Sequence, residues 1–475
     1  TRTPEVETGV VFSPDSRTLL YASERGGRWG IYQARRARAE EPYFHASTVL
    51  VETPVIVNDH QNFQPRYSPD GKEIAYIEDY TNLRVLNLAS GQTRTLLTQK
   101  ELWGTGPNQH FEWSPDGQWI LFDYAVPGLA PGEVGLVKAA GGEPAINLTQ
   151  SGFDDASPMW ILGGKAMLWR SNRDGLHSLA MSGRDEMDAY AMFFTREAWD
   201  RFRLSKEDYA LLKEAEEAAR KKEGKGEEKE STQKGKAVPE RVVLELDGVR
   251  DRRARLTIHS SSMGGALMSE DGETLYYLAR FEKGMNLWST NLRTKETKQV
   301  LALDANAASM AWDSAQKKIF VVADGGMSLV DPSSGKRESI RIAGEMVVDG
   351  DAERAALFDR VWRRTRDTFY TEGHHGVDWV ALGSEYRRYL GGVGDGHDFA
   401  ELLSEMLGEL NVSHSGARYT RRAEPGDETA SLGIFHDWAH ADSGVLVVEV
   451  MKGGPLDRPG MDVTPGTLIT AIDGV

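Results

Sequence analysis

The fold is decided by one recurring stretch, which reads Tyr67-Ser68-Pro69-Asp70-Gly71 and continues as Ile74-Ala75-Tyr76-Ile77. In such a turn, proline presets the backbone of the first turn position, aspartate caps the turn, and glycine supplies a positive φ angle. One strand enters the turn and an alternating apolar strand leaves it, so the stretch predicts a β-hairpin.

Related stretches recur along residues 1–346 at a nearly constant spacing. Asp70 precedes Asp116 by 46 residues, and Ser269 precedes Ser314 by 45 residues. With the strands that follow the hairpins, each copy contains about four strands, which at this period is typical of a propeller blade. We therefore predict a mainly β fold in which residues 1–346 form a β-propeller with six visible blades. A seventh blade before Thr1 and an all-β sandwich are the alternatives, and six copies of one turn disfavour the sandwich. The other turns begin near Phe12, Trp113, Trp160, Met268 and Trp312.

Residues 195–240 interrupt the repeat inside the fourth blade. The segment opens with a helical pattern, Glu197-Ala198-Trp199-Asp200-Arg201-Phe202, and 13 of the 18 residues from Lys213 to Glu230 are charged. Such a composition lacks the apolar periodicity that a packed element needs. We predict a solvated helix that runs into a disordered loop, with a lid or docking arm as the alternative.

The pattern changes to helix over residues 347–424 and back to strand over residues 425–475. Asp351 is the expected N-cap of the first helix. Apolar residues recur at helical spacing after Asp351, between Val380 and Leu390, and between Asp398 and Leu410. The third helix is followed by a loop that reads Asn411-Val412-Ser413-His414-Ser415-Gly416. We therefore predict a propeller, then a small three-helix segment, then a partial β domain.

Composition excludes several classes of function. The net charge of −16 disfavours nucleic acid and anionic lipid as partners. The absence of cysteine excludes disulfides and thiolate chemistry, and no apolar run is long enough to span a membrane. Both ends read as internal, because Thr1 is not a methionine and Ile472-Asp473-Gly474 resembles the middle of a hairpin. We therefore expect that these residues give no information on whether the protein carries a targeting signal.

Two histidine pairs are weak candidates for a metal site. His374 and His375 stand beside Glu372, but adjacent side chains point apart on a regular backbone. His436 and His440 lie four apart, but in a region that reads as strand and loop and not as helix. We predict no metal and no cofactor, and no Gly-x-Ser-x-Gly elbow of a serine hydrolase occurs.

A family resemblance rests on the helical segment. The run Gly376-Val377-Asp378-Trp379, followed by Glu405-Met406-Leu407-Gly408-Glu409-Leu410 and the Ser413-His414 loop, resembles the core of tricorn-type serine peptidases. The order of propeller, short helices, Ser-His and PDZ-like domain is similar to theirs. In addition, Ser431-Leu432-Gly433-Ile434 resembles the carboxylate-binding loop of PDZ domains, so residues 425–475 are expected to form part of such a domain.

The resemblance implies roles for particular residues. His414 is expected to be the general base for a serine nucleophile, and Ser413 to belong to the same hydrogen-bonded group. The nucleophilic serine and an orienting glutamate are expected beyond Val475. Physical chemistry agrees with the role of His414, because a serine hydroxyl needs a base and the pKa of imidazole lies near neutrality.

The predicted function is therefore hydrolysis of oligopeptides by acyl transfer, with peptides as the partners. Tricorn-type enzymes form cytoplasmic homo-oligomers in some organisms and are exported in others, which makes a cytoplasmic oligomer the expectation and export the alternative. A non-enzymatic scaffold of propeller and PDZ-like domain is the competing function. A prolyl-oligopeptidase relative is disfavoured, because such enzymes place a serine elbow beside the propeller.

Overall fold

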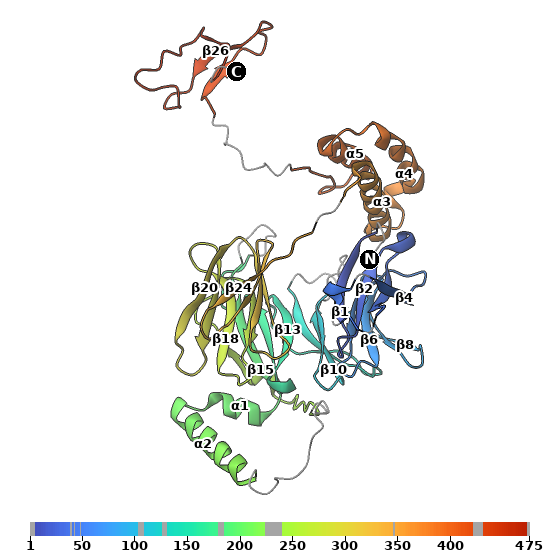
Figure 1. The fold of residues 1–475 in the computed structure, drawn as a ribbon, viewed down its shortest axis with the longest axis vertical. Coiled ribbons are helices and arrows are strands. Elements are labelled where there is room, and N and C mark those ends of the chain that lie inside the picture. Colours follow the sequence, from blue (N-terminus) through green and yellow to red (C-terminus); the bar gives the residue numbers. More distant parts are fainter. Residues whose placement is uncertain are drawn as a thin grey trace. The chain divides into compact units, whose positions relative to one another are not determined.

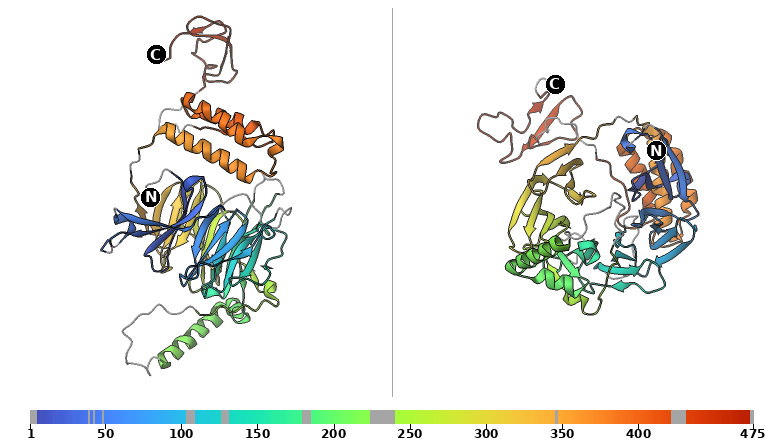
Figure 2. Two further views of the ribbon diagram at one scale, coloured as in Figure 1. Left: turned by 90° about the vertical axis from the view of Figure 1, so that its right-hand side faces the viewer. Right: turned by 60° about the horizontal axis from the view of Figure 1, so that its bottom comes forward.

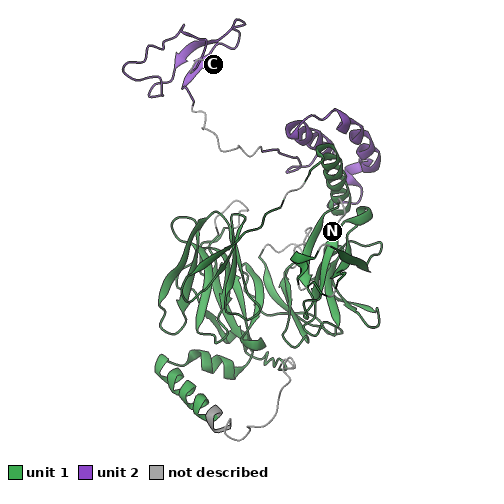
Figure 3. Cartoon of the chain, in the orientation of Figure 1, with its two compact units in different colours: residues 1–369 green, residues 370–475 purple. Residues whose placement is uncertain are grey.

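The structure is a computed structural model that describes residues 5–38, 40–41, 43–47, 49–102, 109–125, 131–178, 185–223, 240–344, 347–420 and 431–472. The chain divides into two compact units, Thr1–Phe369 and Tyr370–Val475 (Figure 3). The division into residues 1–346, 347–424 and 425–475 stays a prediction. Across the described ranges, no helix combines the length and apolar content that crossing a membrane requires.

In its described ranges, the first unit contains six antiparallel sheets of four strands each (Figure 1), and Figure 2 shows them arranged in a ring. Consecutive strands pair within each sheet, so every sheet is a meander. This confirms the predicted mainly β propeller with six visible blades. The first three blades consist of β1 (Glu7–Phe12), β2 (Thr18–Ser23), β3 (Gly30–Arg36) and β4 (Leu50–Ile56); β5 (Asn62–Tyr67), β6 (Glu73–Glu78), β7 (Asn82–Asn87) and β8 (Thr93–Leu97); and β9 (Phe111–Trp113), β10 (Trp119–Tyr124), β11 (Glu133–Lys138) and β12 (Ile146–Asn147). The last three consist of β13 (Asp155–Ile161), β14 (Ala166–Ser171), β15 (Asp188–Phe193) and β16 (Arg253–Arg255); β17 (Ser262–Met268), β18 (Thr274–Arg280), β19 (Met285–Asn291) and β20 (Thr297–Ala305); and β21 (Ala308–Trp312), β22 (Ile319–Ala323), β23 (Gly326–Val330) and β24 (Arg337–Ile340).

The recurring turn is closed by its own side chains. In the second blade, Ser68 Oγ donates to Asp70 Oδ1 at 2.7 Å and accepts from the backbone N–H of Glu73 at 2.9 Å. The serine–aspartate bond recurs at 2.6–2.7 Å in the first, third and fifth blades. Each serine therefore joins the turn to the strand that leaves it, which explains why both residue types repeat in the sequence.

The proline and glycine of the turn also pack the blades together. A Cβ atom on Gly71 would lie 3.5 Å from the ring of Pro14, which belongs to the turn of the preceding blade. A Cβ atom on Gly117 would likewise lie 3.5 Å from the ring of Pro69. Both glycines have a positive φ near 70°, which an L side chain adopts only with strain. The turn is thus an interblade contact as well as a hairpin end.

Apolar clusters fill the interfaces between consecutive blades. Leu20 and Ile31 of the first blade meet Ile74 of the second, and all three are fully buried. At the interface of the third and fourth blades, Trp169 is 1% exposed and stacks on Tyr190 with ring centroids 5.4 Å apart. Full burial of such a side chain contributes about 1.5–3 kcal/mol, so the interfaces hold the ring together.

A partly buried carboxyl group, that of Glu112, lies between the third and fourth blades. Glu112 accepts a hydrogen bond from the backbone N–H of Trp160 at 3.1 Å. Burial raises the pKa of Glu112 to about 7, against the lowering effects of that hydrogen bond and of Arg66. Between its ordinary pKa and 7, the folded state therefore binds a proton that the unfolded state has lost, so this group makes stability fall as the pH rises through that window.

We expect Glu112→Gln to raise the melting temperature near pH 8 and to leave it nearly unchanged near pH 5. The neutral amide removes the cost of ionising a buried group, about 1–2 kcal/mol once its residual contact with solvent is allowed for, and still accepts from Trp160. Calorimetry at the two pH values measures the effect, with the exposed Glu270→Gln as control. An equal change at both pH values would contradict the assignment.

The insertion in the fourth blade forms two helices, α1 (Arg196–Arg203) and α2 (Lys206–Glu223). Thr195 caps α1 by accepting from the N–H of Ala198, and Phe202 packs on Phe193 of β15 at a centroid distance of 4.7 Å. The guanidinium of Arg293, from the fifth blade, donates to the carbonyls of Phe202 and Leu204 at the end of α1. The predicted helical start is present, and α1 packs one face on the blades while Arg196, Glu197 and Asp200 are exposed. The predicted disordered loop falls on residues 224–239, outside the described residues.

Helix α3 (Gly350–Thr368) also belongs to the first unit. Its cap is Asp349, whose carboxylate accepts from the N–H groups of Asp351 and Ala352, so the sequence-based choice of Asp351 as cap was wrong by two residues. Arg363 Nη2 bonds Glu24 at 2.8 Å, and this ion pair ties the helix to the first blade.

The described part of the second unit contains two α-helices and a small sheet. Helix α4 (Trp379–Arg387) lies between the 3₁₀ turns η5 (His374–Gly376) and η6 (Arg388–Gly392), and α5 (Gly396–Gly408) follows. The sheet has the order β25 (Ile434–His436), β26 (Val445–Val450), β27 (Leu468–Ile469). The expected second and third helices are therefore present, whereas the PDZ-like identity of the sheet stays a prediction.

Candidate functional site

The Ser413-His414 loop leaves a well-anchored helix. Asp395 caps the start of α5 by accepting from the N–H groups of His397 and Asp398. At the other end, Met406 is fully buried and Leu410 is 1% exposed. Because both ends of α5 are fixed, the loop starts from a defined position.

The loop itself is held at three points. His375 Nδ1 donates to the carbonyl of Leu410 at 2.9 Å, where the loop begins. Ser415 Oγ donates to the carbonyl of Val412 at 2.8 Å, across Ser413 and His414. At the far end, Ser404 Oγ of α5 accepts from the N–H of Ala417 at 2.8 Å and donates to its carbonyl at 3.1 Å. The backbone around His414 is therefore braced by side chains.

His414 projects from this braced loop with its side chain exposed to solvent, and so does Ser413. His414 has a positive φ of 61°, in the left-handed region that non-glycine residues rarely adopt, and Asn411 has 48°. Within the described part of the chain, the imidazole makes no hydrogen bond. An accessible imidazole on a fixed loop can accept a proton from a hydroxyl brought to it, but the described residues supply neither that hydroxyl nor a carboxylate to orient the ring.

The histidine pair at His374 and His375 has structural partners in place of a shared metal. The ring of His374 stacks on Trp379, with centroids 5.9 Å apart and planes within 3° of parallel. His375 bonds Leu410 through Nδ1 and the hydroxyl of Tyr370 through Nε2. No local sequence signal marks His375 as a residue that positions the Ser-His loop, because the contact joins positions 35 residues apart.

A hollow of about 600 Å³ lies between α4 and α5 and is lined largely by carboxylates. Tyr386 donates to Glu409 Oε1 at 3.1 Å, and burial together with this hydrogen bond raises the pKa of Tyr386 to about 12. The negative charge of the hollow favours binding of cationic groups over anionic ones. The acidic residues of its lining are Glu385, Asp398, Glu401, Glu405 and Glu409.

One group of side chains in the second blade has the composition of a cation site. His60, Glu78 and Asp79 place their ligand atoms within 4.8 Å of one another. However, Arg84 Nη1 already bonds Glu78 at 2.5 Å, and His60 Nδ1 bonds Asp79 at 2.6 Å. The hydrogen bond that the ring donates to Asp79 raises the pKa of His60, so protonation of the ring competes with binding of a metal.

The predicted carboxylate-binding segment, Ser431 to Ile434, leads into the small sheet. Gly433 is buried with a positive φ of 66°, and its N–H bonds Ser431 Oγ at 3.2 Å. Ile434 begins β25, which lies at the edge of the sheet. In the described ranges, no hydrogen bond or ring contact joins these residues to the loop that carries Ser413 and His414.

We expect Ser404→Ala to loosen the Ser-His loop without unfolding the protein. The substitution removes both hydrogen bonds to Ala417, whereas Ser404 contributes little apolar packing. Amide hydrogen exchange at Ala417 should become about 10-fold faster or more, with the melting temperature nearly unchanged. The matched control is Ser384→Ala, which removes a hydroxyl bonded within α4. Unchanged exchange at Ala417 would show that the clamp does not brace the loop.

Comparison with known proteins places this region in a family. Residues 351–408, from α3 to α5, match the tricorn protease C1 domain. Two Streptomyces coelicolor proteins are similar to the chain. The one named tricorn protease homolog 2 is 25% identical over 406 residues, covering 78% of this chain and 33% of that protein. Tricorn protease homolog 1 is 33% identical over 136 residues, covering 27% of this chain and 13% of that protein.

The fold agrees with these matches. The crystal structure of the tricorn protease aligns with a TM-score of 0.61 and 13% identity, over 91% of this chain and 40% of that one. The chain thus spans well under half the length of the relatives that it matches. The domain match, the two related sequences and the shared fold together show that the chain is a homologue of the tricorn-type proteases.

Proposed function

We propose that the protein is a serine peptidase that hydrolyses oligopeptides, with His414 as the general base for a serine supplied outside residues 1–475. The observation that carries this proposal is the exposed His414 on a loop braced by His375, Ser404 and Ser415. This loop directly follows the residues that match the tricorn protease C1 domain.

The chemistry proceeds by acyl transfer. His414 takes the proton of the serine hydroxyl as the oxygen attacks the peptide carbonyl, and the resulting imidazolium gives that proton to the departing amine. Water then attacks the acyl-enzyme by the same route and restores the serine. Ser413, which immediately precedes the base, is proposed to hydrogen-bond within this catalytic group.

The segment Ser431, Leu432, Gly433 and Ile434 is proposed to bind a peptide by its terminal carboxylate. The positive φ of Gly433 turns the backbone at the entry to β25, and the free edge of β25 offers main-chain groups to an added strand. To release the N–H of Gly433 for a carboxylate, the Ser431 hydroxyl has to rotate away from it.

Hydrolysis of fluorogenic peptide amides tests the proposal. The protein at the full length encoded by its gene should release the fluorophore and be labelled by a fluorophosphonate, whereas residues 1–475 should do neither. If the full-length protein is folded but neither hydrolyses peptides nor reacts with the fluorophosphonate, the peptidase proposal fails. A non-enzymatic scaffold, the competing function, then becomes the explanation.

A further inference from the structure

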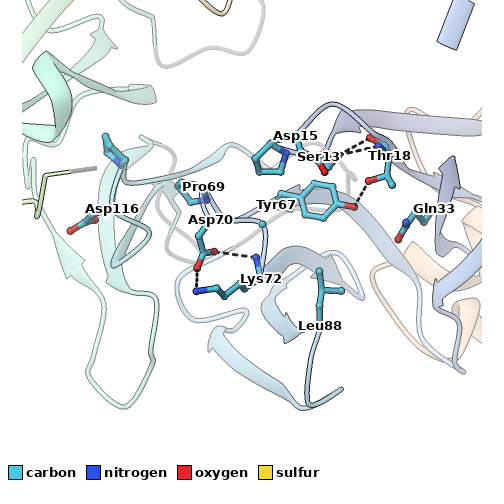
Figure 4. A pocket seen from close by; sticks show the side chains of 13 residues that line it. Ser13, Asp15, Thr18, Gln33, Tyr67, Pro69, Asp70, Lys72, Leu88 and Asp116 are labelled. Carbon is cyan, nitrogen blue, oxygen red and sulfur yellow. Dashed lines mark hydrogen bonds and ion pairs between the residues drawn. The ribbon is translucent and has the colours of Figure 1, made fainter. Parts of the chain in front are cut away.

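The turns of the first three blades enclose a groove of about 890 Å³ on one face of the propeller (Figure 4). Its wall includes the hydroxyl of Tyr67, which is hydrogen-bonded to Thr18 Oγ1 at 3.1 Å. Leu88 contributes an apolar side chain that is 41% exposed. The groove thus combines apolar surface with the carboxylates of the repeated turns, and its principal lining residues are Pro14, Asp15, Tyr67, Pro69, Asp70 and Leu88.

At the next interface around the ring, the corresponding position is occupied by the chain itself. The N–H of Val242 donates to Asp116 Oδ2 at 2.8 Å. The side chain of Val242 is 7% exposed and lies against Gly164, where a Cβ atom would come within 2.6 Å of it and within 3.4 Å of Pro115. Val242 is therefore seated where the proline of the third blade meets the glycine of the fourth.

The segment that carries Val242 has the pattern of an added strand. Val242 is buried, the next residue Val243 is 56% exposed, and Leu244 is again partly buried against the interface of the third and fourth blades. Further along, the N–H of Glu245 donates to the carbonyl of Phe194 at 2.9 Å. Alternating side chains with main-chain hydrogen bonds are how an extended peptide binds a protein surface.

The turns of the first and second blades offer the same acceptor. In each aspartate, Oδ1 closes the turn through a serine, as it does in Asp116. Among the described residues, the other oxygen of Asp15 faces only Arg17, at 3.9 Å, and that of Asp70 faces only Lys72, at 3.3 Å; the two cationic side chains are 80% and 78% exposed. Exposed cations of this kind are held weakly, so the two Oδ2 atoms remain available to a peptide N–H.

The apolar part of the site repeats as well. Leu88 and Leu292 occupy equivalent positions, because each N–H bonds a carbonyl just before the second strand of its own blade. Leu292 is 5% exposed and packs in the cluster that includes Trp199 and Phe202 of α1. The insertion thus covers this face of the fifth blade, while over the second blade Leu88 stays open in the structure described.

From this internal precedent, we propose that the groove binds an extended polypeptide segment with alternating apolar residues, in the way that the chain binds its own residues around Val242. A β-branched or leucine side chain lies beside the contact of Pro14 with Gly71 or of Pro69 with Gly117, as Val242 lies beside the contact of Pro115 with Gly164. The N–H of that residue donates to Asp15 or Asp70. This binding does not depend on the peptidase activity proposed above.

A peptide with the sequence of residues 240–247, Glu-Arg-Val-Val-Leu-Glu-Leu-Asp, is the probe. Labelled with a fluorophore and titrated with the chain of residues 1–475, it should bind saturably, with a Kd on the order of 10 µM. The double variant Asp15→Asn/Asp70→Asn should weaken binding about 10-fold or more, because the turn keeps the oxygen of each amide and presents its NH₂ group to the peptide N–H. Leu88→Glu should weaken binding similarly by placing a charge on the apolar wall.

Controls localise the peptide. Asp271→Asn makes the same change in the turn of the fifth blade, outside the groove, and should leave the affinity unchanged. Circular dichroism checks that each variant is folded, and Leu88→Glu tests the site without altering a turn. The proposal is overturned if the peptide does not bind saturably, or if neither groove variant weakens it. It is also overturned if only Asp116→Asn affects binding, since the peptide would then be displacing the chain's own segment.

Discussion

Replacing His414 with alanine in the full-length protein is expected to lower kcat for peptide hydrolysis about 10³- to 10⁶-fold, with little change in KM. The general base of a serine peptidase acts on the chemical step, so its loss removes transition-state stabilisation and leaves the binding of substrate nearly intact. Initial rates on a fluorogenic peptide amide over a range of concentrations separate the two constants.

The stability of this variant should match that of the wild type. The His414 side chain is exposed and makes no hydrogen bond in the described part of the chain, so its removal costs little packing. The control is His177→Ala, since His177 is also exposed and lies on the propeller. If His414→Ala retains wild-type kcat while the full-length enzyme is active, another group is the base and the assignment of His414 is wrong.

The propeller could be predicted because its signal is local and repeated. Ser68, Pro69, Asp70 and Gly71 each have a separate physical reason to be in the turn, and all of those reasons act within five residues of sequence. Because the turn repeats at a constant period, each predicted hairpin can be assigned to a propeller blade. The packing of Gly71 on Pro14 could not be predicted, because one sequence does not show which turns become neighbours.

Of the candidate site, only Ser413 and His414 were predicted from the sequence. The family resemblance points to Ser413 and His414, but the residues that brace their loop act through contacts distant in sequence. Ser404 bonds a residue 13 positions away, and His375 bonds one 35 positions away. In the sequence, Ser404 is an ordinary helix residue, and His375 belongs to a histidine pair that is only a weak candidate for a metal site. Such roles follow from the tertiary fold and have no local signal.

In the propeller, Asp188 likewise has a stabilising role that no local sequence signal indicates. Asp188→Ala is expected to destabilise the first unit by about 3–5 kcal/mol. Asp188 is fully buried at the start of β15. Its carboxylate accepts from Thr257 Oγ1 at 2.6 Å and from Ser260 Oγ at 2.7 Å, and it pairs with Arg255 Nη2 at 2.8 Å. Arg255 ends β16, and Thr257 and Ser260 lie on the connection between the fourth and fifth blades. Loss of the carboxylate therefore leaves that connection with unpaired buried groups.

Thermal and urea unfolding measure the loss, and a double-mutant cycle attributes it to the network. Asp200→Ala, which changes an exposed residue of α1, should stay within about 0.5 kcal/mol of wild type. Thr257→Ala alone should cost about 1–3 kcal/mol, and it should cost less in the Asp188→Ala background, because the hydroxyl has already lost its acceptor. If the two substitutions are additive instead, Asp188 stabilises the propeller by some route other than the blade connection.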